Sequence, residues 1–360
     1  MKILLLNNLI SYTYNFRREI IEAFAHAGHD VVVVAENDDE GKKQELLKSC
    51  RIIEVKFNGT GTNVFEELSL LNTYRRIVRQ EKPDFVFTFT IKMNLYGALA
   101  CKKYHVPYVP MITGLGELEK EGKLRALLLK MHRMVMPYAE AVLFQNQDNL
   151  NFFDEHRIAY RKAFVLPGSG INLEKFRYAD YPSGDVINFA FLGRIIRAKG
   201  VEEYFKAAEK LASPSMVFHA AGRINDEYKE RVDDLVKRGK LVYEGVLSDS
   251  RDYLASSSCL VLPTFHPEGL SNAILEANAV GRPVICTSRT GCKEIVTDGE
   301  NGFFCREKDS EDLEKVIMKF ASLSVSERTE MGRRGREIVE KKFDRKIVVE
   351  KYLSLLEERE

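Results

Sequence analysis

The chain contains no tryptophan, has almost no net charge and carries its cysteines without any paired CxxC spacing. Isolated cysteines argue against a zinc cluster and against a disulfide framework. They are Cys50, Cys101, Cys259, Cys286, Cys292 and Cys305. A formal charge of +1 provides no bulk attraction for nucleic acid. We therefore predict reduced thiols and no nucleic-acid partner.

Long apolar runs are also absent. No segment approaches the roughly 20 apolar residues that are needed to cross a bilayer. Residues 2–6 already have the pattern of a strand, so no secretory leader is expected. These observations predict a cytoplasmic protein, either free or peripheral on the inner face of the cell membrane.

Short apolar runs rich in β-branched residues alternate with helical patterns along most of the chain, which is typical of parallel βαβ units. The predicted strands of a first series are 2–7, 30–35, 51–55, 84–89, 108–111, 141–145 and 162–166. Those of a second series are 186–192, 216–220, 241–243, 259–262, 283–286 and 302–305. The 360 residues exceed the usual size of one domain, so we predict two α/β domains, each with a doubly wound parallel sheet.

The two series are separated by GSGINLEKFRYADYPSGD, residues 168–185, which lacks periodicity and is predicted to be the interdomain linker. Ligands of doubly wound sheets bind outside the carboxyl ends of the strands. We therefore expect the chemistry to lie in a cleft between the two domains.

Two glutamates in PEGLSNAILEANAVGRPV are the first candidate ligand residues. Glu268 is predicted to lie in a loop, and Glu276 on a helix that opens after Gly269. At about 1.5 Å of rise per residue, their carboxylates lie up to roughly 12 Å apart, which suits a long ligand better than a bond-cleaving pair. The free N–H groups at the start of the helix favour a phosphate between them. This layout fits a nucleotide diphosphate with a sugar attached.

A basic turn opens the second series, in FLGRIIRAKGVEEYFKAA. The strand is predicted to end at Gly193 and a helix to start near Gly200, with Arg194 and Lys199 in the turn. Two cations beside a helix N-terminus can neutralise a diphosphate and stabilise the charge that develops as it leaves. A solvated basic turn is the alternative for this motif alone.

Together, GR…KG, PxxxxEG, the glutamate pair, GRPV and GCKEIV…GENGF resemble the retaining glycosyltransferases of family 4, which have the GT-B fold. The resemblance covers nearly the whole chain and is strongest in residues 186–305. It implies an acceptor-binding domain at 1–168, a nucleotide-sugar-binding domain at 169–342, and a C-terminal helix, 343–360, that crosses back to the first domain. It also implies that no metal or cofactor is required, in agreement with the absence of a DxD motif. The acidic run at 37–40 is predicted to be a solvated loop.

The resemblance assigns roles to individual residues. Arg194 and Lys199 would bind the donor diphosphate, and Glu268 would hold hydroxyls of the donor sugar. Glu276 would accept hydrogen bonds from the ribose. The remaining expected donor contacts are Gly193, Gly269, Leu270 and Ser271.

The first domain departs from the commonest pattern of this family. The turn NNLISYTYNFR lacks the usual glycine pair, and TIKMNLYGALA lacks a histidine. Instead, TIKxNxYG and TGLG resemble members that glycosylate lipid-linked or capsular precursors. The residues implied for the acceptor or the cleft are Asn15, Arg17, Thr90, Lys92, Asn94, Gly114 and Gly116.

Residues 123–135 are predicted to form a basic amphipathic helix. Lys123, Arg125, Lys130, His132 and Arg133 surround an apolar face. That face is predicted to consist of Leu124, Leu127, Leu128, Met131 and Val135. Such a helix could rest on an anionic membrane surface and thereby approach a polyprenyl-linked acceptor. The alternative is a core-facing helix with a solvated basic side.

The sequence therefore predicts a retaining, metal-independent glycosyltransferase with a UDP-sugar donor. The sugar is expected to be an N-acetylhexosamine or a hexose, and the acceptor a polyprenyl-diphosphate-linked saccharide of bacterial surface glycan assembly. Two alternatives stay open at this stage. One is a nucleotide-sugar 2-epimerase of the same fold, and the other is a non-catalytic nucleotide-sugar-binding protein.

Overall fold

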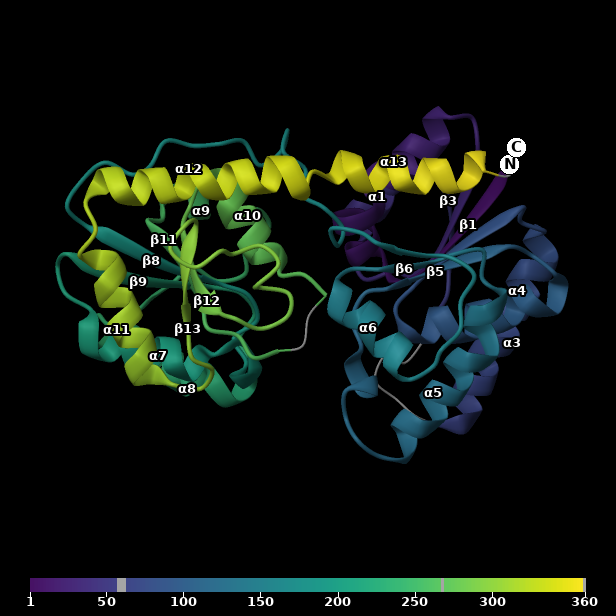
Figure 1. Cartoon of the computed structure of the whole chain (residues 1–360), viewed down its shortest axis with the longest axis horizontal. Coiled ribbons are helices and arrows are strands. Elements are labelled where there is room, and N and C mark those ends of the chain that lie inside the picture. Colours follow the sequence, from purple (N-terminus) through teal and green to yellow (C-terminus); the bar gives the residue numbers. More distant parts are fainter. Residues whose placement is uncertain (57–62, 267–268, 359–360) are drawn as a thin grey trace. The chain divides into compact units, whose positions relative to one another are not determined.

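The computed structural model describes residues 1–56, 63–266 and 269–358, and it divides the chain into two compact units. Unit 1 comprises Met1–Ser169 together with Lys346–Glu360, and unit 2 comprises Gly170–Arg345. Both units contain a parallel sheet with helices on its two faces, as the alternating pattern predicted (Figure 1).

The sheet of unit 1 has seven strands in the order β3-β2-β1-β4-β5-β6-β7. Its strands are β1 (Lys2–Leu9), β2 (Asp30–Glu36), β3 (Arg51–Glu54), β4 (Phe85–Phe89), β5 (Tyr108–Ile112), β6 (Val142–Phe144) and β7 (Ala163–Val165). Its helices are α1 (Ile10–His26), α2 (Glu40–Leu46), α3 (Val64–Glu81), α4 (Ala98–Tyr104), α5 (Lys123–Val135) and α6 (Gln147–Glu155). A π-helical turn, η1 (Met93–Gly97), and two 3₁₀ turns, η2 (Gly116–Leu118) and η3 (Met136–Tyr138), complete the unit.

The sheet of unit 2 has six strands in the order β10-β9-β8-β11-β12-β13. Its strands are β8 (Ile187–Leu192), β9 (Met216–Ala221), β10 (Val242–Tyr243), β11 (Cys259–Leu262), β12 (Val284–Thr287) and β13 (Gly302–Cys305). Its helices are α7 (Val201–Leu211), α8 (Lys229–Lys237), α9 (Arg251–Ser256), α10 (Asn272–Val280), α11 (Ser310–Ala321) and α12 (Val325–Lys342), with 3₁₀ turns at η4 (Arg197–Lys199) and η5 (Asp226–Tyr228). Every strand that the sequence predicted is present, and all ladders within the two sheets are parallel.

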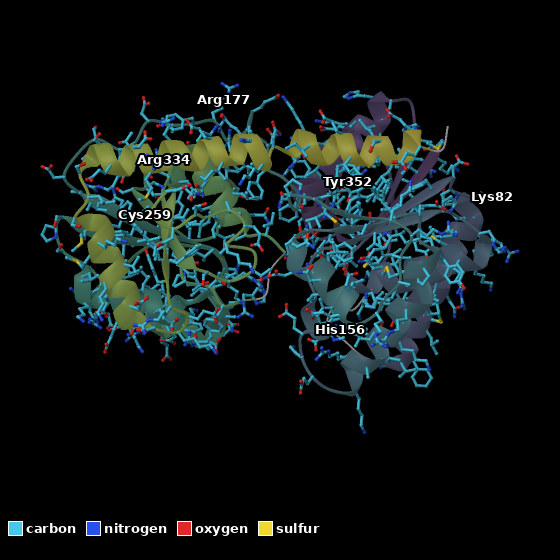
Figure 2. All side chains as sticks on the ribbon, viewed as in Figure 1. Lys82, His156, Arg177, Cys259, Arg334 and Tyr352 are labelled. Atoms are coloured by element: carbon cyan, nitrogen blue, oxygen red, sulfur yellow. The ribbon has the colours of Figure 1, made fainter. Side chains whose placement is uncertain are left out.

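Both faces of each sheet are buried, which explains why the strands are continuous apolar runs rather than alternating patterns. On β1 of unit 1, Leu4 and Leu6 pack with α3, η1 and α4, whereas Ile3 and Leu5 pack on the opposite face with α1. Unit 2 has one large core on and around its sheet. Cys259 lies in this core (Figure 2).

The last helix, α13 (Arg345–Glu357), belongs to unit 1 from Lys346 onward, so the predicted return of the C-terminal helix to the first domain is confirmed. Tyr352 is fully buried, with its ring centroid 5.0 Å from that of Phe87 and 6.2 Å from that of Phe89 (Figure 2). Val348 and Leu356 join the same core. The C-terminal residues therefore help to build the hydrophobic core of unit 1.

Candidate active site

The carboxyl end of β8 carries the basic turn that the sequence singled out. Gly193 has φ +150°, a conformation that L side chains rarely adopt. The guanidinium of the next residue, Arg194, is exposed, and its Nη2 lies 3.4 Å from Nε2 of His266. A guanidinium held at the edge of a sheet in this way can meet two oxygens of an anionic ligand.

Lys199 ends the 3₁₀ turn η4, and this turn is fastened to the loop that follows β11. The backbone N–H of Phe265 and the hydroxyl of Thr264 both donate to the Ala198 carbonyl, at 2.9 and 3.2 Å. The helix predicted to start near Gly200 begins at Val201. Gly200 has φ +78°, and a Cβ there would lie 2.1 Å from the Pro263 carbonyl oxygen. The segments that carry Lys199 and His266 are therefore held at fixed positions relative to each other.

Phe265 strengthens this connection through its ring. The Arg197 guanidinium lies 5.0 Å from the ring centroid and the Lys308 ammonium 4.8 Å from it. Arg197 is itself ion-paired with the buried carboxylate of Glu203. Glu268 lies outside the described residues, so the structure gives no position for this predicted sugar contact.

The N-terminus of α10 lies directly after Gly269 and Leu270, both of which are buried. Ser271 is the N-cap residue, but its side chain caps no N–H group. Its hydroxyl oxygen is buried and has no hydrogen-bond partner among the described residues, while its backbone N–H donates to the Gly291 carbonyl at 2.9 Å. The first N–H groups of a helix have no acceptor within the helix, so a free hydroxyl beside them, at the positive end of the helix, is suited to an anion. The helix starts at Asn272, later than the predicted start just after Gly269.

Glu276 lies on α10, as predicted, and accepts a hydrogen bond of 2.6 Å from the Ser250 hydroxyl. Burial raises the pKa of this carboxyl above its usual value, and the Ser250 hydrogen bond and the charges of Lys175 and Arg345 oppose that rise. A partly buried carboxylate with one oxygen fixed by Ser250 can accept further hydrogen bonds from hydroxyl groups of a ligand. Sequence reasoning missed Ser250, because nothing in the local pattern connects it with a residue on a later helix.

The predicted acceptor residues of unit 1 are placed in different surroundings. Asn15 is exposed on α1, whereas Arg17 is buried. Arg17 donates to the Ser169 hydroxyl at 2.7 Å, and its guanidinium carbon lies 4.4 Å from the centroid of the Phe89 ring. These contacts give Arg17 a role in packing within unit 1.

The TIKMNLYG segment forms an unusual turn after β4. Thr90 has φ +68°, which is rare for a β-branched residue, and its carbonyl accepts from the Asn94 N–H at 2.9 Å. Asn94 is buried and connects two strands, since its side chain accepts from Thr88 at 2.7 Å and donates to the Met111 carbonyl at 2.8 Å. Lys92 forms a 2.6 Å ion pair with Glu67 of α3. Strained backbone of this kind is concentrated at functional sites.

The TGLG segment follows β5 and leads into η2. Gly116 has φ +50°, a conformation that glycine adopts readily at a tight bend, and Gly114 is half-buried.

Residues 123–135 form helix α5, but its buried face differs from the prediction. The buried residues are Leu129, His132 and Val135, whereas Leu124 and Leu127 are 38% and 54% exposed. Burial lowers the pKa of His132 to about 4, so this residue is not one of the surface cations. Leu128, Met131 and Val135 pack on the core of unit 1 as predicted. The prediction was wrong for Leu124 and Leu127, which are exposed because the buried face is rotated toward Leu129 and His132.

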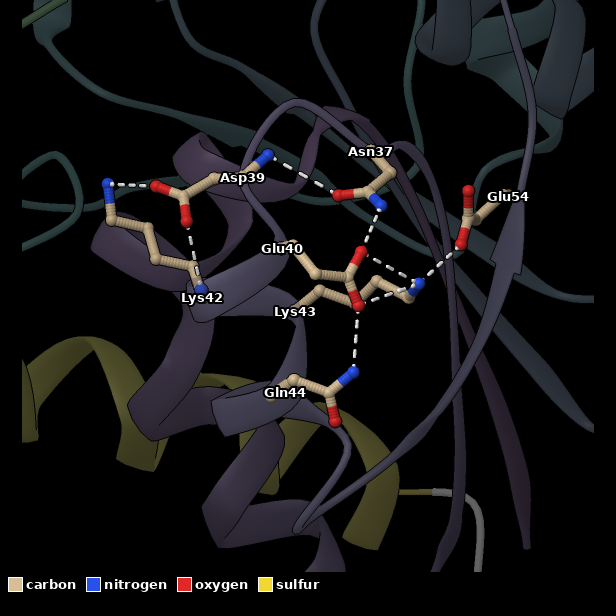
Figure 3. Close-up of polar contacts among 7 residues, drawn as sticks. All are labelled: Asn37, Asp39, Glu40, Lys42, Lys43, Gln44 and Glu54. Atoms are coloured by element: carbon tan, nitrogen blue, oxygen red, sulfur yellow. Dashed lines mark hydrogen bonds and ion pairs between the residues drawn. The ribbon is translucent and has the colours of Figure 1, made fainter.

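The acidic run after β2 is used to build α2. Asp39 caps the helix by accepting from the Lys42 N–H at 3.0 Å, and Glu40 accepts from Asn37 at 2.8 Å (Figure 3). Lys43 bridges Glu40 and Glu54. These hydrogen bonds hold the pKa of Glu40 at about 2. Across the described ranges, no group of three or more His, Cys, Asp or Glu side chains is arranged to hold a metal ion.

A cavity of about 390 Å³ in unit 1 was not predicted. It is lined by Glu36, Lys56, Glu66, Glu67, Ser69, Leu70, Thr73 and Lys92. Its residues come from the ends of two strands, from α3 and from the turn before η1, so no single sequence motif contains them. Among the helices that the structure describes, none is long and apolar enough to span a membrane.

Comparison with known proteins gives matches along both units. Residues 2–146 match the family described as glycosyl transferase 4-like, and residues 180–338 match glycosyl transferases group 1. The chain is 24% identical to N,N'-diacetylbacillosaminyl-diphospho-undecaprenol alpha-1,3-N-acetylgalactosaminyltransferase of Campylobacter jejuni, over 99% of this chain and 98% of the relative. It is 25% identical to the capsular polysaccharide biosynthesis glycosyltransferase CapM of Staphylococcus aureus, over 96% of this chain and 94% of the relative.

Solved structures agree on the fold. The Anabaena protein HepE, crystallised in complex with UDP, superimposes with a TM-score of 0.79 at 16% identity, covering 99% of this chain and 100% of that one. Two family matches in series, and full-length likeness to glycosyltransferases, agree with the resemblance seen in the sequence motifs. The chain is therefore a glycosyltransferase of the GT-B fold, with a glycosyl transferase 4-like first domain and a second domain of the glycosyl transferases group 1 type.

Proposed function

We propose that the protein is a retaining, metal-independent glycosyltransferase that moves an N-acetylhexosamine or hexose from a UDP-sugar to a polyprenyl-diphosphate-linked saccharide. The name of the Campylobacter relative supports both the sugar class and the lipid-linked acceptor, and the UDP complex of the Anabaena protein supports the donor base. The product would belong to the assembly of a bacterial surface polysaccharide or glycan.

One observation carries the proposal, namely the anion site at the start of α10. Ser271 offers a buried hydroxyl with no partner in the described part of the chain, beside the N–H groups of the first helical turn, which have no acceptor within a helix. We assign the donor diphosphate to this site, with Gly269 and Leu270 contributing backbone groups. Arg194 and Lys199, together with the turn at Gly193, would bind the same diphosphate and stabilise its charge as it leaves.

Glu276 and Glu268 would hold the two ends of the donor. Glu276, fixed by Ser250, would accept hydrogen bonds from the ribose hydroxyls. Glu268 would accept them from hydroxyls of the transferred sugar. Binding both ends in this way fixes the anomeric carbon relative to the acceptor.

The transfer would proceed on one face of the sugar. The acceptor hydroxyl oxygen forms a bond to the anomeric carbon, while the bond from that carbon to the phosphate oxygen breaks. The acceptor proton passes to the leaving phosphate oxygen, so that UDP departs and the anomeric configuration is kept. This step requires neither a carboxylate nucleophile nor a metal ion.

Helix α5 would bring the enzyme to the membrane that holds the acceptor. Its exposed surface combines the apolar side chains of Leu124 and Leu127 with the ammonium groups of Lys123 and Lys130. Basic groups around exposed leucines complement an anionic lipid surface. Flotation with phosphatidylglycerol vesicles should therefore be reduced in the Lys123→Gln/Lys130→Gln double variant. Phosphatidylcholine vesicles should bind weakly to both proteins.

Lys229→Gln/Lys237→Gln on α8 is the matched control, because it removes two exposed lysines from a helix of unit 2. Equal flotation of the α5 variant and this control would contradict the membrane assignment.

The function is tested with a matrix of nucleotide sugars against polyprenyl-diphosphate-linked saccharides, with and without EDTA. We expect a UDP-sugar to be consumed only in the presence of a lipid-linked acceptor, and we expect NMR of the product to show the donor's anomeric configuration. Arg194→Ala should abolish transfer, whereas Arg238→Ala, an exposed arginine of unit 2, should not.

The outcomes separate the alternatives. Inversion of configuration, or loss of turnover with EDTA, would contradict the mechanism. Formation of an epimer without any acceptor would indicate a 2-epimerase. Binding of UDP-sugar without turnover on any acceptor would indicate a binding protein.

A further inference from the structure

The cavity of unit 1 lies where β2 and β3 end and α3 begins. Glu36 ends β2, Lys56 follows β3, and Glu66 and Glu67 lie in the first turn of α3. Because carboxyl ends of parallel strands are where doubly wound sheets bind ligands, this cavity is in the expected part of unit 1 for a binding site. Its volume of about 390 Å³ lies in the range of small-molecule pockets.

The charges of the cavity exclude some ligands. Three carboxylates line it, from Glu36, Glu66 and Glu67, against the two ammonium groups of Lys56 and Lys92. Lys92 is ion-paired with Glu67 at 2.6 Å, and both side chains are only 17% exposed. Its charge is thus already matched within the protein. An excess of negative charge is unfavourable for a diphosphate.

Hydrogen-bonding capacity remains open in the same cavity. No polar side-chain partner of Glu36 or Glu66 occurs among the described residues, and each carboxylate can accept several hydrogen bonds. Ser69 and Thr73 add two hydroxyl groups on the same helix. A neutral ligand with many O–H and N–H donors is the best complement to this set, and a saccharide is such a ligand.

A second, neighbouring cavity of about 480 Å³ shares Ser69 and Thr73 and is bordered by Phe65 and Leu68. The Phe65 side chain is 83% exposed. An exposed aromatic ring beside polar acceptors offers an apolar surface to the C–H groups of a sugar ring while the carboxylates take its hydroxyls.

We propose that the cavity lined by Glu36 and Glu66, together with the adjoining one beside Phe65, binds the saccharide of the lipid-linked acceptor, and not its diphosphate. Glu36 and Glu66 accept hydrogen bonds from its hydroxyl or amide groups, and Phe65 packs against the ring. Lys92 is a positioning residue that holds Glu67 in the wall and does not bind phosphate. The inference rests on the proposed function, because it names the part of the acceptor that unit 1 recognises.

The binding test uses the full-length protein and needs no catalysis. Saturation-transfer NMR is recorded with the methyl glycosides of glucose, galactose, N-acetylglucosamine and N-acetylgalactosamine, and pyrophosphate is tested separately by ³¹P line broadening. We expect at least one glycoside to bind. Its dissociation constant should rise about tenfold in Glu36→Gln and in Phe65→Ala, because each variant loses one contact of the kind worth about 1–2 kcal/mol.

The Glu45→Gln variant is the control, since Glu45 is an exposed glutamate of α2 in the same unit that pairs with Lys48 outside the cavity. It should bind the glycoside as the wild type does. Saturating UDP should not displace the glycoside. Glycoside binding that is absent, unaffected by Glu36→Gln, or abolished by UDP would overturn the proposal. So would pyrophosphate binding that is lost in Lys56→Gln and strengthened in Glu36→Gln.

A kinetic test separates this inference from the proposed function. With a lipid-linked acceptor that supports transfer, Glu36→Gln should raise the acceptor KM about tenfold and leave the donor KM unchanged. Transfer with an unchanged acceptor KM in Glu36→Gln would support the proposed function and contradict saccharide binding at the cavity. Glycoside binding at the cavity without transfer to any acceptor would support the binding site and contradict the proposed function.

Discussion

We expect the Glu276 carboxylate to lower the stability of the folded protein and to contribute to donor binding. The Glu276→Gln variant tests both expectations. Burial raises the pKa of the Glu276 carboxyl in the folded protein above the ordinary value of 4.5. Between these two pKa values the folded state holds a proton that the unfolded state has released. Stability therefore falls as pH rises through that interval, and the full cost is present above it.

Glutamine is neutral at every pH and keeps an oxygen that can accept from Ser250. Each unit by which burial raises the pKa corresponds to about 1.4 kcal/mol. For a domain of this size, 1 kcal/mol changes the melting temperature by roughly 2–4 °C. The ligand-free Glu276→Gln variant should thus melt at a higher temperature than the wild type at pH 8. The difference should vanish as the pH approaches 4.5.

The same substitution should weaken donor binding. A hydrogen bond to a charged group contributes about 1.5–3 kcal/mol, so loss of the carboxylate should raise the dissociation constant of UDP roughly tenfold to a hundredfold. Melting curves from pH 4.5 to 8 and isothermal titration calorimetry with UDP measure the two effects. Glu300→Gln, at an exposed site of unit 2, should change neither quantity. A variant that melts below the wild type at pH 8, or that binds UDP unchanged, would refute the reasoning.

Three further predictions concern buried polar groups. Arg282 is fully buried and donates to five backbone carbonyls. Lysine offers at most three donors, so Arg282→Lys should destabilise unit 2 by about 3 kcal/mol in urea unfolding. An unchanged midpoint of the urea transition would contradict this prediction. The Asn94→Leu variant leaves the Met111 carbonyl without its hydrogen-bond donor, so it should have a lower melting temperature than the wild type even without ligand. If the variant changes only the acceptor KM, Asn94 is a ligand contact instead. Burial lowers the pKa of His132 to about 4, so between pH 6.5 and 4 the unfolded state binds a proton that the folded state does not. The free energy of unfolding should therefore fall by about 3 kcal/mol as the pH drops from 6.5 to 4. His132→Leu should flatten that part of the stability profile, and an equally steep profile in this variant would disprove the prediction.

The sequence predicted most of the architecture because parallel strands buried on both faces leave a strong local signal. The strand runs of β1 and β8, for example, are apolar almost throughout. The positions of Arg194 and Glu276 also followed from local patterns, since a strand end and a helix each place their side chains in a defined way. These features depend on neighbours in the chain.

The features that escaped prediction depend on residues far apart in the chain. The contact between Ser250 and Glu276 connects different elements of unit 2, and the cavity beside α3 gathers side chains from several elements of unit 1. The buried face of α5 was predicted only in part, because leucines occur on more than one side of that helix and periodicity alone could not show that Leu129 faces the core.

The discontinuity of unit 1 has a consequence for how the protein is made. Its core includes Tyr352, Leu355 and Leu356, near the end of the chain, whereas unit 2 is encoded in one uninterrupted stretch from Gly170 to Arg345. Domains generally fold as units while the chain emerges from the ribosome. The domain that is synthesised first is therefore completed last, after the second has all its residues. Until α13 is synthesised, Phe87 and Phe89 lack their contacts with Tyr352. A premature stop codon just before α13 should therefore destabilise unit 1 more than unit 2, although translation stops at the end of unit 2.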